Sequence, residues 1–379
     1  MKKVLVVHNF YREFGGEDSN IYEEIEFLKS NYEISFYEEQ NLDSLNIQNY
    51  FSFISLNNSK TNRKLKTLIK EFKPEIIYVH NTWFKINLGI FNLIKKSKIK
   101  VVLKIHNFRY KCADTFSIKL HLAGNSICPA CGIKKNNRNI FNKYYQNSYI
   151  KSFFLILFTK KLNKIILNNN IKLIAISEFH KKNLIKHGFN KDNIFVIHNP
   201  IKLNINPNLV KQNTVVYAGR IIAEKGVEEL LYNWSLIKNN NYKLLIIGEG
   251  NLKNKLELIY SSENIKFLGF LSNNETKRYI NNSKAVITAT KLYEGQPRLL
   301  SEASSQGVIS IYPSFGGMDE FFPINYEFRF EQFNYIDMIE KIKLLDNKNL
   351  VLKTLKELNN FNCDLFDSER NFKLYEKVF

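Results

Sequence analysis

Two carboxylates in the stretch 289–307 stand in a setting that suits an anionic ligand. Glu294 and Glu302 are separated by seven residues, and Gly295 and Pro297 closely follow the first of them. Apolar runs flank the stretch, so the pattern predicts a strand, a loop, a helix starting near Pro297 and a second strand. Loops at the carboxyl ends of parallel strands bind ligands, and free N–H groups at a helix start bind anions. A second interpretation is two solvated glutamates on a surface helix.

A second loop places two cations between a predicted strand and a predicted helix. Arg220 and Lys225 are bracketed by Gly219 and Gly226. Two positive side chains and the backbone N–H groups of a helix start suit a diphosphate. The alternative is a solvated loop between a strand and a helix.

The amino-terminal half offers weaker signals of the same kind. Gly15 and Gly16 follow the first apolar strand and precede a helix, but they do not make a full dinucleotide fingerprint, so a tight turn explains them too. His106 ends the predicted strand 100–106, at the edge where ligands bind, and we favour it over His80, which ends a neighbouring strand.

The elements that position these residues alternate between strand and helix, which predicts an α/β protein with doubly wound parallel sheets. The alternation stops at the segment 199–208, rich in Pro and Asn, and then restarts. We therefore expect two Rossmann-like domains, 1–199 and 200–379. The helical segments after Asn334 are expected to cross back onto the first domain.

An insertion without clear periodicity, 107–150, carries three of the four cysteines. Cys128 and Cys131 form a Cys-x-x-Cys pair, and with Cys112 they have spacing typical of a structural zinc site, to which His121 could add a ligand. The alternative is three reduced cysteines that pack the insertion. The length and apparent compartment of the chain do not favour disulfides.

Composition narrows the classes of partner. The chain has 379 residues and a formal net charge of +19, but only nine of its 55 basic residues are arginine. Because base recognition depends on the arginine fork, we expect no nucleic-acid partner. No stretch is long enough to span a membrane and no signal peptide is evident, so we expect a cytoplasmic protein.

The predicted helix 151–167 combines an apolar run with lysines. Such a basic amphipathic helix can lie on the inner leaflet of a membrane, which would make the protein peripheral on the cytoplasmic face. A helix buried in the core explains the same apolar run.

The stretch from Glu294 to Glu302 resembles the signature of retaining glycosyltransferases of family 4: Glu, seven residues and Glu, with Gly and Pro after the first Glu. The Arg220 and Lys225 loop and the later Gly316-Gly317 loop are similar to that family as well. The resemblance covers nearly the whole chain. It implies an α/β GT-B fold, in which two Rossmann-like domains face each other across a cleft.

The resemblance also implies roles for the site residues. Glu302 would hold ribose hydroxyls and Glu294 the hydroxyls of the donor sugar. Arg220 and Lys225 would neutralise the leaving diphosphate, and His106 would reach the donor sugar. The residues implied around the donor are Gly15, Gly16, Gly219, Gly295, Gln296, Pro297, Arg298, Leu299 and Glu302.

The implied activity is retaining transfer of a hexosyl-type sugar from a UDP- or GDP-sugar to a glycan or lipid-linked acceptor, as in lipopolysaccharide or capsule synthesis. No Asp-x-Asp motif occurs in the candidate loops, so we expect no metal or other cofactor in catalysis, and zinc only as a structural ion. Gln296 and Arg298 depart from the family pattern beside the donor, which leaves its base open. The alternatives are a GT-B epimerase and a non-catalytic basic protein that binds a membrane or nucleic acid.

Overall fold

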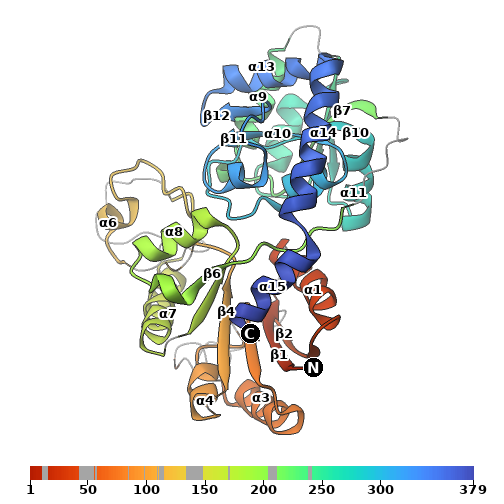
Figure 1. Cartoon of the computed structure of the whole chain (residues 1–379). Coiled ribbons are helices and arrows are strands. Elements are labelled where there is room, and N and C mark those ends of the chain that lie inside the picture. Colours follow the sequence, from red (N-terminus) through yellow and green to blue (C-terminus); the bar gives the residue numbers. More distant parts are fainter. Residues whose placement is uncertain are drawn as a thin grey trace. The chain divides into compact units, whose positions relative to one another are not determined.

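The computed structural model describes residues 1–10, 16–41, 55, 58–83, 85–97, 99–108, 110, 115–133, 148–169, 171–203, 211–237 and 241–379. The chain divides into two compact units (Figure 1). Unit 1 comprises Met1–Pro200 and Ser368–Phe379, and unit 2 comprises Ile201–Asp367. The chain therefore returns to unit 1 at its carboxyl end.

Unit 1 contains a six-stranded sheet in the order β2-β1-β3-β4-β5-β6, and all neighbouring strands are parallel. The strands are β1 (Lys3–Phe10), β2 (Glu33–Gln40), β3 (Ile76–Val79), β4 (Lys100–Ile105), β5 (Lys172–Ala175) and β6 (Ile194–Val196). The central strands β1 and β3 are buried along almost their whole length, because both faces of a parallel sheet are covered.

The helices of unit 1 are α1 (Gly16–Lys29), α3 (Ser59–Phe72), α4 (Gly89–Ser97), α6 (Ile118–Leu122), α7 (Tyr149–Asn168), α8 (Glu178–Lys186) and α15 (Ser368–Val378). Asn58, Ser148 and Ser177 cap α3, α7 and α8 by accepting hydrogen bonds from backbone N–H groups of the first turn. Tyr375 and Val378 of α15 join the same hydrophobic core as the strands of unit 1.

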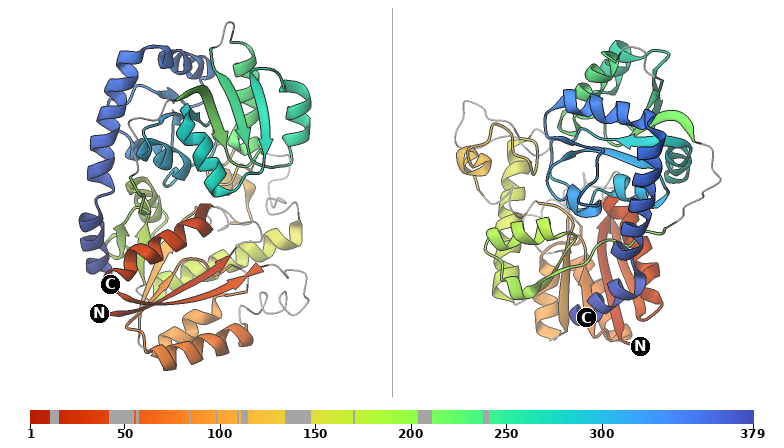
Figure 2. Two further views of the ribbon diagram at one scale, coloured as in Figure 1. Left: turned by 90° about the vertical axis from the view of Figure 1, so that its right-hand side faces the viewer. Right: turned by 45° about the horizontal axis from the view of Figure 1, so that its top comes forward.

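Unit 2 contains a second parallel six-stranded sheet, in the order β12-β11-β10-β7-β8-β9. Its strands are β7 (Gln212–Ala218), β8 (Lys243–Ile247), β9 (Ile265–Gly269), β10 (Ser283–Ile287), β11 (Ile309–Ser314) and β12 (Arg329–Glu331). Its helices are α9 (Val227–Ser235), α10 (Lys253–Tyr260), α11 (Asn273–Asn282), α12 (Arg298–Ser305), α13 (Tyr335–Lys343) and α14 (Lys348–Leu365). Helix α9 packs against α10 and α13, whereas α12 packs against α14 (Figure 2).

The two parallel sheets and their flanking helices confirm the expected fold class of two Rossmann-like domains. The sequence pattern did not predict the short strand β12 or the short helix α6 inside the insertion. None of the helices in the described ranges combines the length and the hydropathy that a membrane crossing requires.

Candidate active site

The candidate site of unit 2 forms where four neighbouring strands end. In the order of the sheet, β11, β10, β7 and β8 lie side by side, and each is followed by a loop with glycine or a charged residue. Because the strands are parallel, all four loops lie along the same edge of the sheet. The two loops that the sequence singled out, after β7 and β10, are central neighbours.

Glycines let these loops approach one another. A Cβ atom on Gly226 would lie 1.9 Å from the carbonyl oxygen of Ala289, and one on Gly248 would lie 2.0 Å from that of Gly219. Gly226 also has φ of +67°, in the left-handed region that favours glycine, and it caps the start of α9. Side chains at these positions would separate the loops.

Lys225 and Glu294 meet across this junction. The Lys225 ammonium donates to Oε1 of Glu294, and the two side chains are 23% and 27% exposed. The Gly317 N–H donates to the carbonyl oxygen of Glu294 at 2.9 Å, and a Cβ on Gly316 would lie 3.2 Å from the Glu294 nitrogen. The loops after β7, β10 and β11 thus hold a cation and a carboxylate side by side, both accessible to a ligand.

Arg220 lies in the same loop as Lys225, near the carboxyl end of β7. The Tyr217 hydroxyl donates to the main-chain carbonyl of Arg220 at 2.8 Å. Burial raises the pKa of Tyr217, the positive charge of Arg220 opposes the rise, and the negative charge of Glu294 adds to it. One buried hydroxyl is therefore within electrostatic reach of both Arg220 and Glu294. The Arg220 side chain is exposed and available to an incoming anion.

Glu302 lies in α12 and is held by two cations. Its Oε1 accepts from Arg298 Nε at 2.8 Å, and Lys277 of α11 lies 3.8 Å away. The Glu302 side chain is only 12% exposed, so it is not the solvated surface glutamate of the alternative interpretation. Pro297 occupies the N-cap position of α12, as its place in the sequence predicted. Of the remaining residues in this stretch, Gly295 and Gln296 are buried and Leu299 is half-buried.

His106 belongs to unit 1, where three histidines follow one edge of the sheet. His8 is in β1, and His80 and His106 directly follow β3 and β4, the next two strands of the sheet. His80 Nδ1 and His106 Nε2 are 3.0 Å apart, so one ring donates to the other. Burial lowers the pKa of His106 well below its ordinary value, and the charges of His80 and Lys104 lower it further. His106 is therefore a neutral hydrogen-bonding group at neutral pH. His80 and His106, which the sequence offered as alternative ligand-binding residues, therefore form a hydrogen-bonded pair.

The glycine pair is only partly described. Gly16 is the first residue of α1, which starts after the carboxyl end of β1 as the sequence predicted. Gly15 lies outside the described residues, and so does Cys112.

Sequence reasoning missed a buried charged cluster behind the histidines. Glu24 of α1 and Lys104 of β4 form an ion pair of 2.7 Å, with side chains 1% and 0% exposed. The hydroxyls of Tyr78 and Tyr375 both donate to Oε1 of Glu24, at 2.6 and 2.5 Å. One feature of the sequence could have indicated this cluster: Glu24 falls on the apolar stripe of its helix, where a charged residue implies a buried partner.

The predicted metal ligands are partly assembled. Cys128, Cys131 and His121 place one ligand atom each within 4.8 Å of one another. The sequence offers His121 as a further ligand, and the structure brings it to the cysteine pair.

Family models match both halves of the chain. The model described as Glycosyltransferase Family 4 matches residues 30–205, and the model described as Glycosyl transferases group 1 matches residues 200–360. Together they cover residues 30–360, which include every strand of both sheets except β1. The second match contains every unit 2 loop described above.

Curated relatives match parts of the chain. Poly(ribitol-phosphate) alpha-N-acetylglucosaminyltransferase of Staphylococcus aureus is 27% identical over 51% of this chain and 41% of the relative. The amylovoran biosynthesis glycosyltransferase AmsD of Erwinia amylovora is 28% identical over 37% of this chain and 42% of the relative. The chain thus spans less than half the length of these two relatives.

Solved structures share the fold over the whole chain. HepE of Anabaena, in complex with UDP and glucose, has a TM-score of 0.69 at 12% identity and covers 100% of this chain and 99% of its own. At this identity the likeness concerns the fold alone. The likeness shows the GT-B fold, and the two family models, which together span residues 30–360, show that the chain belongs to the family 4 type of glycosyltransferases.

Proposed function

We propose that this protein transfers a sugar from a nucleoside diphosphate sugar to a glycan or lipid-linked acceptor, with retention of anomeric configuration and without a catalytic metal. The observation that carries the proposal is the pairing of Lys225 with Glu294 at the ends of two central strands. A cation for phosphate and a carboxylate for sugar hydroxyls stand in hydrogen-bond contact, so one small ligand can engage both.

The leaving diphosphate gains negative charge as the sugar bond breaks. Lys225 and Arg220 can stabilise that charge, together with the backbone N–H groups at the start of α9. When the diphosphate binds, Lys225 exchanges Glu294 for a phosphate oxygen, which releases the Glu294 carboxylate for sugar hydroxyls. Removing one such donor costs about 2–4 kcal/mol of transition-state stabilisation.

Retention is proposed to follow from attack on the same face that the diphosphate leaves. A leaving phosphate oxygen then takes the proton of the acceptor hydroxyl, and no covalent sugar–enzyme bond is needed. Glu294 orients the sugar in this scheme. The Staphylococcus relative is named for an alpha-linked product, which is the product that same-face transfer from an alpha-linked donor gives.

The nucleoside is proposed to rest on Glu302, whose carboxylate accepts ribose hydroxyls. Arg298 and Lys277 form ion pairs with that carboxylate and fix its orientation. HepE is named in complexes with UDP and with UDP-glucose, which favours UDP over GDP as the first nucleotide to test.

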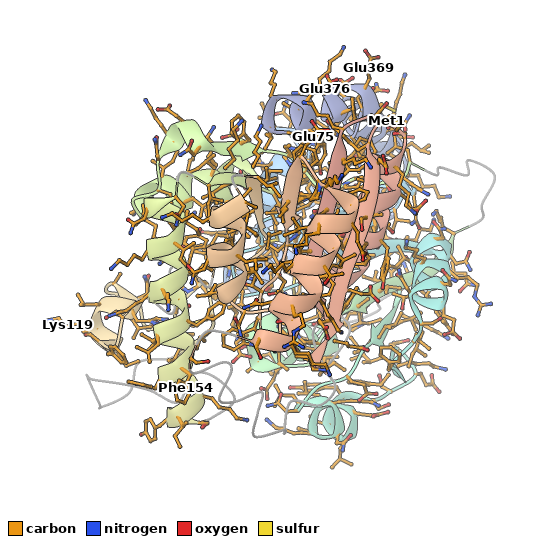
Figure 3. All side chains as sticks on the ribbon, turned by 90° about the horizontal axis from the view of Figure 1, so that it is seen from below. Met1, Glu75, Lys119, Phe154, Glu369 and Glu376 are labelled. Carbon is orange, nitrogen blue, oxygen red and sulfur yellow. The ribbon has the colours of Figure 1, made fainter. Side chains whose placement is uncertain are left out.

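The acceptor is proposed to be a growing cell-surface polysaccharide at the cytoplasmic face of the membrane, with α7 as the contact. Ile150, Phe153 and Leu157 of α7 are 70%, 41% and 40% exposed. Lys160, Lys161 and Lys164 continue this face and are exposed. Apolar side chains followed by cations suit an anionic lipid surface. Phe154, labelled in Figure 3, lies in the amino-terminal half of α7, as these apolar side chains do.

The experiment is a thermal-shift titration with UDP and GDP in the presence of EDTA. A nucleotide at 100 times its dissociation constant stabilises the protein by about 2.7 kcal/mol. A shift with one nucleotide in wild type, absent in Lys225→Met, supports the site. A folded protein whose melting temperature shifts with neither nucleotide would favour the non-catalytic alternative. In a separate experiment, NMR of the transferred sugar's anomeric proton decides between retention and inversion.

A further inference from the structure

The segment 115–133 of unit 1 has very little hydrophobic core of its own. Its buried cluster consists of Ile118, Leu122, Cys128 and Ile133, with Ala130 and Cys131 packed against it. The only helix among these residues, α6, is five residues long. Short helices and small apolar clusters are marginal without a cross-link or a metal ion. A segment with so small a core of its own is one that a bound metal ion would stabilise strongly.

The polypeptide around the two cysteines adopts a tight turn. The Cys128 N–H donates to the Ile133 carbonyl at 2.8 Å, and the Gly132 N–H donates to the Cys128 carbonyl at 2.7 Å. Gly132 has φ of +78°, a conformation that glycine adopts readily. The turn folds the backbone around the two thiols and presents both on one side.

Helix α6 supplies a third ligand to the same point. Ala123, at φ of +46°, ends the helix two residues after His121, and its N–H donates to the Lys119 carbonyl. His121 Nε2 lies 3.1 Å from Cys131 Sγ. His121 and Cys128 are 9% and 4% exposed, so the group is largely shielded from water. Lys119, on the exposed side of α6, is labelled in Figure 3.

The separations fit one tetrahedral ion. With Zn–S bonds of about 2.3 Å and Zn–N bonds of about 2.0 Å, tetrahedral ligand atoms lie about 3.5–3.8 Å apart. The three ligand atoms here all lie within 4.8 Å of one another. Small side-chain rotations are enough to bring all three to bonding distance.

We propose that His121, Cys128 and Cys131 bind a zinc ion that fixes α6 to the cysteine turn and replaces the missing core of the segment. Two thiolates and an imidazole form a ligand set for zinc, whereas magnesium and calcium prefer oxygen. The ion is structural, and the proposal is independent of the proposed transfer reaction.

The test measures bound metal in the full-length protein grown in zinc-supplemented medium. Elemental analysis should find about one zinc per chain in wild type and close to none in Cys128→Ser or His121→Ala. Cys363→Ser is the matched control, because Cys363 is exposed on α14 and should leave the zinc content unchanged.

A second measurement on wild type alone avoids dependence on folded variants. Cys128 and Cys131 should resist a thiol reagent until a strong chelator is added, and cobalt substitution should give the visible absorption of a tetrahedral thiolate complex. Wild-type protein that contains no zinc, and whose thiols react equally fast with and without chelator, would overturn the proposal.

Discussion

Replacement of Tyr375 by Phe tests how α15 is attached to the rest of unit 1. The Tyr375 hydroxyl donates to Oε1 of Glu24 at 2.5 Å, and its side chain is 1% exposed. Burial raises the pKa of Tyr375 well above its ordinary value, and the Glu24 charge raises it further, so the hydroxyl remains a donor. The substitution removes that donor and keeps the ring.

The acceptor is charged, which sets the magnitude. Burial pushes the pKa of Glu24 upward, but the charge and hydrogen bond of Lys104 and the bonds from Tyr78 and Tyr375 outweigh it, so the pKa is lowered. Hydrogen bonds to charged groups contribute about 1.5–3 kcal/mol to the free energy of unfolding. For a unit of 150–250 residues, each kcal/mol lost lowers Tm by about 2–4 °C. We therefore expect Tyr375→Phe to lower Tm by about 7 °C.

The assay is thermal and urea unfolding followed by circular dichroism. Tyr78→Phe should cost a similar amount, because Tyr78 donates to the same oxygen. The double variant should lose more than the sum, since Oε1 then has neither hydroxyl donor. Tyr232→Phe is the control, because Tyr232 is 54% exposed on α9. A Tyr375→Phe protein within about 0.5 kcal/mol of the Tyr232→Phe control would refute the reasoning.

Three further predictions concern catalysis and pH. Lys225→Met should lower kcat/KM by roughly 30- to 1000-fold, because loss of one donor to the leaving anion costs about 2–4 kcal/mol, while the circular dichroism spectrum stays unchanged. Steady-state kinetics measure this loss, with Lys266→Met as the control variant at an exposed site. Arg298→Gln removes the hydrogen bond that orients the Glu302 carboxylate. It should raise KM for the donor several-fold with little change in kcat, because contacts to the nucleoside act equally in the ground state and the transition state. A loss of kcat alone would contradict that role. Burial lowers the pKa of His180 to about 3. Below about pH 6.5 this histidine binds a proton in the unfolded chain but not in the folded one, so His180 alone should lower the free energy of unfolding by up to about 1.4 kcal/mol per pH unit from there toward pH 3. Urea unfolding at pH 7.5, 6 and 5 checks the slope, which His180→Phe should reduce.

Local signals in the sequence determined the fold class and the main donor-site candidates. Alternating apolar runs and amphipathic helices predicted parallel sheets, because each element reports its own burial through short-range periodicity. Gly226 and Pro297 marked helix starts, since their backbone preferences act locally. The charged loops were identified for the same reason: Arg220 and Lys225 are close in sequence, as are Glu294 and Glu302.

Tertiary structure decided which of these residues meet. Lys225 and Glu294 are 69 positions apart, and their contact depends on β7 and β10 being neighbours, an order that no local pattern encodes. The same applies to Glu24 and Tyr375, which are 351 positions apart. A charged residue in an apolar stripe signals a buried partner, but only the packed core specifies which one.

The insertion illustrates the same division. The spacing of Cys128 and Cys131 suggested a metal pair because both residues belong to one turn. His121 reaches them only because α6 ends where it does and the chain then folds back. Sequence thus determines what each short segment can become, while strand order and packing determine which segments share a site, because contacts between distant residues depend on the folded path of the whole chain.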